Sequence, residues 1–220
     1  MELEPHTSKD IYKAIIRSQH CQRNWDLSKE IPEEDMKLLV DCATQCPSKQ
    51  NVSFYNLHYI TNRYLIEEIH DLSWGFTTKS ETETNSQVLA NLLICFELTD
   101  LEKIIKSDNI FRNDETNNFL KNGKWDEKSF NTLKRDAVIA VGIAAGYLNL
   151  TASLLGYRTG CCQCFDFLGA QKLLKLDNLP ILLMGIGYNN DSVNRRQHHI
   201  RENFMFPTKE KQPITVKFWQ

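Results

Sequence analysis

The sequence predicts a single domain of the α+β or mixed α/β class. The chain has 220 residues, of which 41% are apolar and 25% charged, a composition typical of a globular domain with one large core. Segments with helical spacing of apolar residues alternate with short continuous apolar runs, which are typical of buried strands. No internal repeat and no clear linker interrupts this order. We therefore expect one domain over residues 1–220.

The first half of the chain contains three helical patterns and two strand patterns. Ser8 is a candidate N-cap for the first helix, and the acidic residues after Pro32 favour the start of the second. Pro47 ends that second helix and opens a polar loop. We expect helices at residues 8–21, 32–46 and 63–72, and strands at 55–61 and 92–98.

One long apolar helix dominates the second half of the chain. It is expected to end at Leu155, with Gly156 as its C′ residue, and to follow a flexible, Asn-rich excursion over residues 101–131. A strand and turn at 157–165, a helix at 169–176 and a strand at 181–188 come next. The basic tail, residues 192–220, holds six Lys or Arg against two Glu. Its final ITVKFW stretch alternates apolar and polar residues, which predicts a strand.

Charge and cysteine content limit the cellular setting. The 26 basic and 28 acidic residues give a net charge of −2, which provides no general electrostatic reason to bind nucleic acid or an anionic membrane. The N-terminal MELEPHTSKD lacks the apolar stretch of a secretory signal. Seven cysteines cannot all pair, so a disulfide framework is not expected. We expect a cytoplasmic protein.

Residues 137–155 leave a membrane alternative open. They include no charge and contain Gly142-x-x-x-Gly146, a spacing typical of closely packed membrane helices. A helix at the centre of a soluble protein is equally apolar on all sides. Asn149, Thr151 and Ser153 would be costly in hydrocarbon. We therefore favour a buried soluble helix over a single membrane span.

The cysteine and glycine patterns do not form a standard motif. Cys161, Cys162 and Cys164 crowd one turn, but their spacing is not that of a zinc site, so we expect no metal. We interpret these residues as buried free thiols, with redox chemistry as the alternative. Gly185-Ile-Gly187 is too short for a dinucleotide-binding motif and indicates a strand end.

Three polar clusters indicate a phosphorylated, hydrogen-bonding ligand. They lie at residues 19–23 (QHCQR), 47–51 (PSKQN) and 194–199 (NRRQHH), with Arg201 just beyond. Each alone is typical of a solvated loop. Together they supply guanidinium groups for phosphate oxygens, and amides and hydroxyls for the edge of a heterocycle.

Four segments in order resemble the FMN-dependent nitroreductase family. That family typically opens with a helix ending in R-x-S-x-R-x-F or a near variant, followed by an acidic second helix and a P-S-x-x-N loop. Gln19 and Cys21 replace the usual first Arg and Ser, whereas Arg23 keeps the second basic position. The matching segments are QHCQRNW (19–25), IPEEDMKLLVDCATQCPSKQN (31–51), LNLTASLLGYRTG (148–160) and LPILLMGIGY (179–188).

The resemblance implies a fold, an assembly and a cofactor. The implied fold is α+β and nitroreductase-like, with a central mixed or antiparallel sheet flanked by helices, a long central dimer helix and an extended C-terminal strand. The implied assembly is a homodimer with FMN at the interface. Gly142 and Gly146 fit that arrangement, because small residues let two helix backbones approach closely.

The same resemblance implies the FMN-binding residues. Gln19, His20 and Arg23 would hold the ribityl phosphate side, helped by Arg195 or Arg196, with Arg201 as a rival. Backbone N–H groups of Gln163 and Cys164 would face the flavin N5, and Asn85 is the candidate for the pyrimidine edge. The full expected set is Gln19, His20, Cys21, Arg23, Pro47, Ser48, Lys49, Asn51, Asn85, Gln163, Cys164, Arg195 and Arg196.

The implied activity needs no catalytic side chain, because a flavin carries the electrons itself. NADH or NADPH would reduce FMN and leave, and a nitroaromatic, quinone or similar small acceptor would then take the electrons in a ping-pong reaction. The alternative is a non-catalytic flavin- or nucleotide-binding regulator. Phe54 and Tyr55, which stand where members of the family often carry Pro-Trp, would then close the substrate face.

Overall fold

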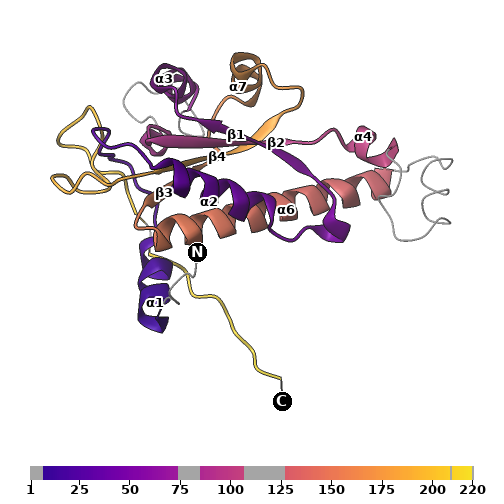
Figure 1. Cartoon of the computed structure of the whole chain (residues 1–220), viewed down its shortest axis with the longest axis horizontal. Coiled ribbons are helices and arrows are strands. Elements are labelled where there is room, and N and C mark those ends of the chain that lie inside the picture. The colour runs from indigo at the N-terminus through magenta and orange to yellow at the C-terminus, as the bar shows by residue number, and fades with distance from the viewer. Residues whose placement is uncertain (1–6, 74–84, 107–126, 209, 220) are drawn as a thin grey trace.

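In the computed structural model, a four-stranded antiparallel sheet lies at the centre of the molecule (Figure 1). The structure describes residues 7–73, 85–106, 127–208 and 210–219. Every neighbouring pair of described strands is antiparallel, which confirms the α+β class and makes the sheet antiparallel rather than mixed. The strands are β1 (Tyr55–Ile60), β2 (Leu92–Leu98), β3 (Arg158–Cys162) and β4 (Pro180–Gly187), in the order β1-β2-β4-β3.

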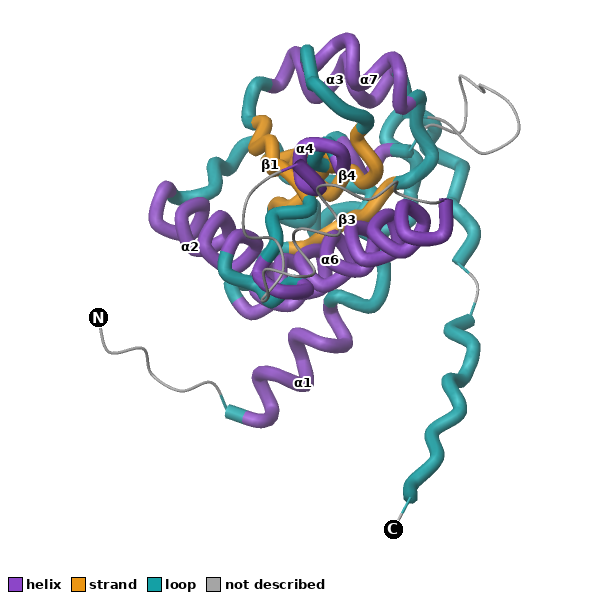
Figure 2. Tube along the Cα trace, turned by 90° about the vertical axis from the view of Figure 1, so that its right-hand side faces the viewer, coloured by secondary structure: helices purple, strands orange, loops and turns teal. Residues whose placement is uncertain are grey.

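Helices cover both faces of this sheet (Figure 2). The long helix α6 and helix α2 lie on one face, whereas α3 and α7 lie on the other. Helix α1 projects away from the sheet beside the end of α6. The α-helices are α1 (Ser8–Arg17), α2 (Glu33–Thr44), α3 (Arg63–Asp71), α4 (Leu101–Lys106), α6 (Glu127–Leu154) and α7 (Phe167–Leu174), and the 3-10 turns are η1 (Lys49–Asn51) and η2 (Ser86–Val88).

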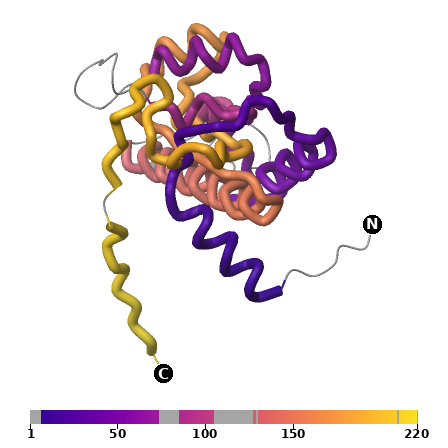
Figure 3. The backbone as a smooth tube through the Cα atoms, turned by 90° about the vertical axis from the view of Figure 1, so that its left-hand side faces the viewer, coloured from indigo at the N-terminus to yellow at the C-terminus, as the bar shows by residue number. Residues whose placement is uncertain are grey.

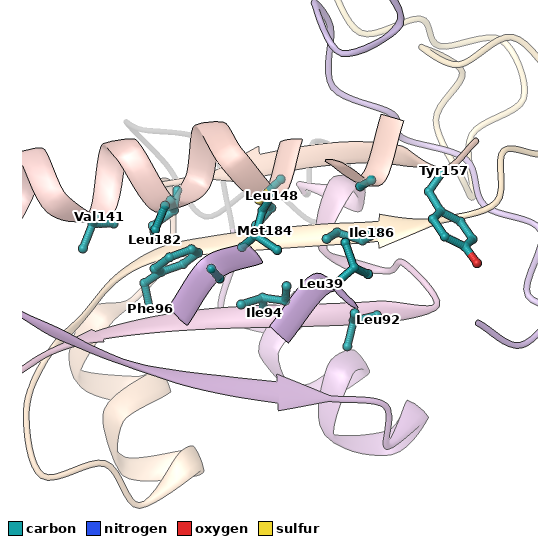
Figure 4. Close-up of a cluster of buried hydrophobic side chains, with 13 residues drawn as sticks. Leu39, Leu92, Ile94, Phe96, Val141, Leu148, Tyr157, Leu182, Met184 and Ile186 are labelled. Atoms are coloured by element: carbon teal, nitrogen blue, oxygen red, sulfur yellow. The ribbon is translucent and has the colours of Figure 1, made fainter. Parts of the chain in front are cut away.

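Strand β2 is buried on both faces, which explains its continuous apolar run. Successive side chains of a strand point to opposite faces. Ile94 and Phe96 pack toward α2 and α6 with Met184 of β4 (Figure 4), whereas Leu93 and Cys95 pack toward α3 and α7. Full burial of such a side chain stabilises the fold by about 1.5–3 kcal/mol, so the two clusters fix the strand's register.

Helix α6 packs one stripe on the sheet and exposes the opposite one. Val141, Ala144 and Leu148 are buried in the core, while Val138 and Tyr147 are exposed on the outer side. By length and composition alone, residues 130–154 could cross a membrane, but the core helix of a soluble protein passes the same test. The packing of α6 on the sheet and α2 is that of such a core helix.

Several predicted element boundaries are wrong. Thr7, rather than Ser8, caps α1, and the helix ends at Arg17, since the Ser18 N–H makes the last i→i−4 bond, to Ala14, and the Gln19 N–H bonds Ile16 instead. The flexible excursion predicted over residues 101–131 contains helix α4 and the start of α6. Its residues 107–126 lie outside the described part of the chain.

The predicted C-terminal strand is absent from the described part of this single chain. Residues 210–219 form no ladder, although the tail is extended (Figure 1). The side chains of Ile214 and Trp219 are 78% and 90% exposed. An alternating pattern becomes a strand only when another strand pairs with it.

Candidate functional site

The residues after α1 run between β3 and the C-terminal tail. The Gln22 N–H donates to the carbonyl of Thr159 in β3 at 2.8 Å, and the Arg23 N–H donates to the carbonyl of Arg195 in the tail at 3.1 Å. Figure 3 shows the indigo segment after α1 beside the yellow tail loop. Segments far apart in sequence therefore meet around Arg23.

Two glycines bring turn η2 against the sheet at this place. A Cβ on Gly160 would lie 2.6 Å from the Cβ of Gln87, and a Cβ on Gly185 would meet the backbone oxygen of Gln87. Both positions therefore need glycine for close approach rather than for a positive φ. The sequence predicted a strand end at Gly185-Ile-Gly187, and these are the last three residues of β4.

We expect Gly160→Ala to move η2 and lower the free energy of unfolding by at least about 1 kcal/mol, because the added methyl overpacks a contact with Gln22 and Gln87. Urea denaturation of both proteins measures the loss. If the midpoint and slope of the urea denaturation curve are unchanged, η2 moves to accommodate the methyl group with no loss of stability.

The guanidinium of Arg23 is held between an amide and an aromatic ring. Its Nη1 donates to Oε1 of Gln87 at 2.6 Å, and its Cζ lies 3.9 Å from the centroid of Phe206. Gln87 Nε2 in turn donates to Asn85 and to the carbonyl of Cys161. Among the described residues, no carboxylate forms an ion pair with Arg23. We call Cys21, Arg23, Gln87 and Arg195 the arginine site.

Other arginines add positive charge around the arginine site. Arg195 Nη1 donates to the carbonyl of Cys21 at 3.2 Å. Burial lowers the pKa of Arg195, and the neighbouring Arg196 lowers it further. Burial, followed by Arg17 and Arg195, lowers the pKa of Arg158. Burial also lowers the pKa of Arg23, although a guanidinium stays charged at neutral pH. Arg195 is thus the tail arginine whose side chain bonds to Cys21 of the arginine site, and Arg196 lies beside it.

The sulfur atoms near the arginine site differ in exposure. Cys162 is buried, and burial raises the pKa of its thiol to about 12, so it is protonated at neutral pH. Cys161 is exposed and Cys164 is half-buried, so the prediction that all three clustered cysteines are buried holds only for Cys162. The carbonyl of Cys164 accepts from Asn85 Nδ2 at 3.1 Å, which fixes the turn after β3. No group of three or more metal-ligating side chains occurs among the described residues.

The other predicted residues of this region are less engaged. Gln19 and Gln163 are exposed and His20 is half-buried, and the described contacts show no side-chain hydrogen bond for any of them. Sequence reasoning missed Gln87 and Phe206, which contact Arg23 directly. Gln87 lies two residues after Asn85, which the sequence analysis selected for the pyrimidine edge. The same NSQVLAN segment therefore pointed to this part of the site.

The loop at residues 47–51 lies elsewhere in the subunit. Lys49 forms an ion pair with Asp136 of α6, and the Ser48 hydroxyl donates to the carbonyl of Val52. Asn149, which bonds Ser18 near the arginine site, is 13 residues from Asp136 along α6, or about 20 Å at 1.5 Å per residue. The structure therefore does not bring Pro47, Ser48, Lys49 and Asn51 together with the arginine site in one chain.

A cavity of about 690 Å³ adjoins this loop, a volume typical of ligand pockets. Ser48 and Asn51 line it together with residues of α2 and β1, but no residue of the arginine site does. The candidate site is thus split into two parts at separate places on the subunit surface.

The Nitroreductase family model matches residues 16–188. The chain belongs to the Nitroreductase family. This family match includes the arginine site up to Gln87, the 47–51 loop and β4, and it stops before the tail that holds Arg195 and Phe206. A search of the curated proteins found no match.

Solved structures share the fold of this nitroreductase-family chain at low sequence identity. A nitroreductase from Bacillus subtilis is 14% identical with a TM-score of 0.66, covering 94% of this chain and 98% of that one. A nitroreductase from Exiguobacterium sibiricum, crystallised in complex with FMN, is 17% identical with a TM-score of 0.62, covering 96% of each chain. An NAD(P)H:FMN oxidoreductase from Staphylococcus epidermidis is 18% identical with a TM-score of 0.60, covering 88% and 95%.

Proposed function

We propose that this chain is an FMN-dependent oxidoreductase that uses NAD(P)H to reduce a nitroaromatic, a quinone or a similar small acceptor. The observation that supports this most directly is Arg23, a partly buried guanidinium with no carboxylate partner among the described residues, in a chain of the Nitroreductase family. The FMN complex of the Exiguobacterium neighbour and the NAD(P)H:FMN description of the Staphylococcus neighbour support the choice of cofactor and donor.

The residues of the arginine site fit a phosphate group. Charge-assisted bonds from guanidinium to phosphate are among the stronger polar contacts, and Arg195 lies close enough to Arg23 to lower the pKa of Arg23, after the larger effect of burial. Arg23 would hold the ribityl phosphate, while Gln87 and Phe206 fix its orientation. Backbone N–H groups of Gln163 and Cys164, in the turn that Asn85 holds, would meet the flavin ring.

The chain's own residues would bind and orient, and none would carry electrons. When bound, FMN would supply both the hydride acceptor and the electron donor of a ping-pong reaction. The protonated Cys162 thiol is unsuited to nucleophilic attack.

We propose a homodimer, because the two parts of the site lie apart in one subunit. In a dimer, the 47–51 loop of one subunit would complete the arginine site of its partner. Apolar side chains exposed on one subunit support this assembly, since burial removes them from water. They are Ile11, Tyr12, Ile15 and Ile16 on α1, Val138, Ile139 and Tyr147 on α6, and Ile214, Val216, Phe218 and Trp219 in the tail.

We expect Gly146→Leu to weaken the dimer while leaving the subunit folded. No heavy atom of the described chain lies within 4 Å of a Cβ placed on Gly146, so the side chain would project outward. Leu also has a better helix propensity than Gly, by close to 1 kcal/mol. Sedimentation of the variant should show monomers where wild type is dimeric. Lys172→Leu, an exposed change on α7, should remain dimeric, and a monomeric wild type that binds FMN would contradict the proposal.

The two side chains of the regulator alternative, Phe54 and Tyr55, differ in their surroundings. Phe54 is 1% exposed in a core cluster with α4 and α6, and the Tyr55 hydroxyl donates to the carbonyl of Ala43 at 2.7 Å. Phe54 is therefore packed inside the subunit, whereas Tyr55 lines the cavity beside the 47–51 loop, and the spectrum described below distinguishes the enzyme from the regulator. All seven cysteines are free, which supports a cytoplasmic location as part of the proposal.

An absorbance spectrum of the purified protein tests the proposed function. We expect a bound-flavin spectrum that bleaches when NADH or NADPH is added without oxygen and returns when a quinone is added. Bound flavin that neither donor bleaches would support the regulator, and failure to bind FMN at micromolar concentration would contradict both.

A second test concerns the thiols near the arginine site. We expect the triple change Cys161→Ser, Cys162→Ser and Cys164→Ser to keep FMN bound and to keep most NAD(P)H-dependent reduction of the acceptor. Serine is nearly isosteric with cysteine, and the flavin mechanism uses no thiolate. Steady-state kinetics of the loaded variant measures this. Loss of turnover by orders of magnitude with FMN still bound would instead favour a redox thiol.

A further inference from the structure

Two adjacent residues of the 47–51 loop have a left-handed backbone conformation. Gln50 has φ 55° and Asn51 has φ 58°, a region that residues other than glycine adopt at a cost. Asparagine adopts it more readily than glutamine does. The other described non-glycine residue with a positive φ is Lys175, at the C-cap of α7, where this conformation is usual. Strain such as that at Gln50 persists only where the surrounding structure holds it.

Packing and short-range hydrogen bonds fix the two ends of the loop. Cys46, just before the loop, packs against the core cluster of α2 and α6, and Val52, just after it, packs against the cluster beside the first half of α6. The Asn51 N–H donates to the carbonyl of Ser48 at 3.2 Å, and the Ser48 hydroxyl donates to the carbonyl of Val52 at 2.8 Å. These bonds close the turn, but they do not attach its middle to another element.

The side chain of Lys49 attaches the middle of the loop to α6. Lys49 Nζ donates to Oδ2 of Asp136 at 2.5 Å, and the Asp136 side chain is 9% exposed. Arg135 Nη2 lies 3.7 Å from the other carboxylate oxygen, but the Arg135 side chain is 68% exposed and belongs to α6 itself. A buried carboxylate that loses its partner is costly, so Asp136 favours the conformation of the loop in which Lys49 reaches it.

The direction of the Lys49 side chain leaves other residues of the loop for a ligand. Ser48 and Asn51 line the cavity beside the loop, whereas Lys49 does not. Asp136 is followed on α6 by Val138 and Ile139, whose exposed side chains belong to the proposed dimer surface. The ion pair therefore joins the loop to the helix that would lie at the dimer interface. A loop that is ordered before it meets a ligand loses less entropy on binding, so its contacts are stronger.

We propose that Asp136 is a positioning residue, which acts through Lys49 to hold the 47–51 loop preformed for the flavin of the partner subunit. The proposal rests on the proposed function and on its homodimer. It gives Lys49 the task of anchoring the loop, in place of the direct cofactor contact that the family resemblance implies. Asp136 itself touches no ligand in this proposal.

Trypsin digestion of the flavin-free protein tests the anchor. Trypsin cleaves after Lys49 once the turn opens, and the rate of this cleavage follows the population of the open turn. Asp136→Asn keeps the size of the side chain and removes its charge, so we expect cleavage after Lys49 to become about threefold faster or more, the value of a half-exposed ion pair. Glu67→Gln breaks another ion pair, with Arg63 on α3, and should leave this cleavage unchanged. Equal rates in wild type and Asp136→Asn would overturn the proposal.

Titration with FMN tests the link between the anchor and the ligand. We expect Asp136→Asn to weaken FMN binding about threefold, because the apparent affinity falls with the fraction of the protein whose turn is closed. Glu67→Gln should bind FMN as wild type does. In the Asp136→Asn background, Gln50→Gly should recover most of the affinity, because glycine adopts a positive φ without strain. An unchanged affinity in Asp136→Asn, or no recovery with glycine, would show that the strained turn is not what Asp136 holds.

A double-mutant cycle separates anchoring from direct contact with the cofactor. In the Asp136→Asn background, Lys49→Met should have no further effect on FMN affinity, because the two changes remove one interaction. Additive losses would make Lys49 a contact of the cofactor and would remove the positioning role of Asp136. A wild-type protein that binds no flavin would instead contradict the proposed function, and with it the ligand of this proposal, whatever the result with trypsin.

Discussion

Arg23→Ala is expected to weaken FMN binding by at least tenfold, or about 1.4 kcal/mol. The wild-type guanidinium is ordered by Gln87 and Phe206 and has no carboxylate partner among the described residues, so an anion is the group that would neutralise it. Charge-assisted bonds to phosphate lose both charge and geometry when the side chain is removed. Fluorescence titration of the purified protein with FMN measures the change.

Two further variants refine this test. Arg23→Lys keeps the charge but loses the planar fork and most of the stacking, so its affinity should fall between those of wild type and alanine. Arg201→Ala removes a tail arginine that lies over Phe204, 5.5 Å from its centroid, and should leave FMN affinity unchanged. Unchanged affinity in Arg23→Ala would remove Arg23 from the site, and a large loss in Arg201→Ala would select the rival arginine.

The elements that could be predicted from sequence are those whose pattern reflects contacts within the chain. Strand β2 is apolar throughout because both of its faces are buried, and α6 was recognisable because its inner stripe and its C-terminal end carry local signals, such as Gly156 with φ +97°. The strand predicted at ITVKFW failed because no described strand of the same chain pairs with it. Helix α4 was missed because its six residues stand in a polar stretch.

The candidate site was predictable where a motif is continuous in sequence. Arg23 follows α1 within a short recognisable segment, and in the structure its N–H bonds the tail at Arg195, next to the bond of Gln22 to β3. Gln87 contacts Arg23 across 64 residues of chain, and Phe206 reaches it from the far end of the tail turn. Gln87 reaches Arg23 because η2 approaches the sheet closely at Gly160 and Gly185, and Phe206 reaches it because the tail folds back. Neither arrangement can be predicted from a local sequence pattern.

A buried pair of imidazoles should make the fold sensitive to acid. His70 of α3 and His199 of the tail meet edge-to-face at 4.9 Å, and His70 Nε2 and His199 Nδ1 are buried without a hydrogen-bond partner. Burial, followed by His198 and Arg63, lowers the pKa of His70 to about 4. Burial, His70 and His198 lower the pKa of His199 to about 4. A carboxylate of the described chain, that of Asp71, lies 3.8 Å from His70 Nδ1, but its side chain is 84% exposed.

These pKa values fix the direction of the pH dependence. The unfolded chain takes up protons on histidine near pH 6.5, whereas the folded chain keeps both rings neutral down to about pH 4. Stability therefore falls as the pH is lowered from about 6.5 to about 4. Each pH unit of this interval is worth about 1.4 kcal/mol per group, so His70 alone should remove about 3 kcal/mol of the free energy of unfolding.

Urea denaturation at pH 7 and at pH 4.5 measures this loss. His70→Phe keeps a flat ring of similar size but cannot titrate, so the variant should lose clearly less stability than wild type between the two pH values. The comparison with the variant is needed because carboxylates also change the stability at low pH. Burial alone would raise the pKa of Glu97, but hydrogen bonds from Asn178 and His58 hold it below its usual range. If wild type and His70→Phe lose the same free energy of unfolding between the two pH values, His70 is protonated in the folded chain. Helix α3 and the tail would then rearrange to accommodate the charged ring.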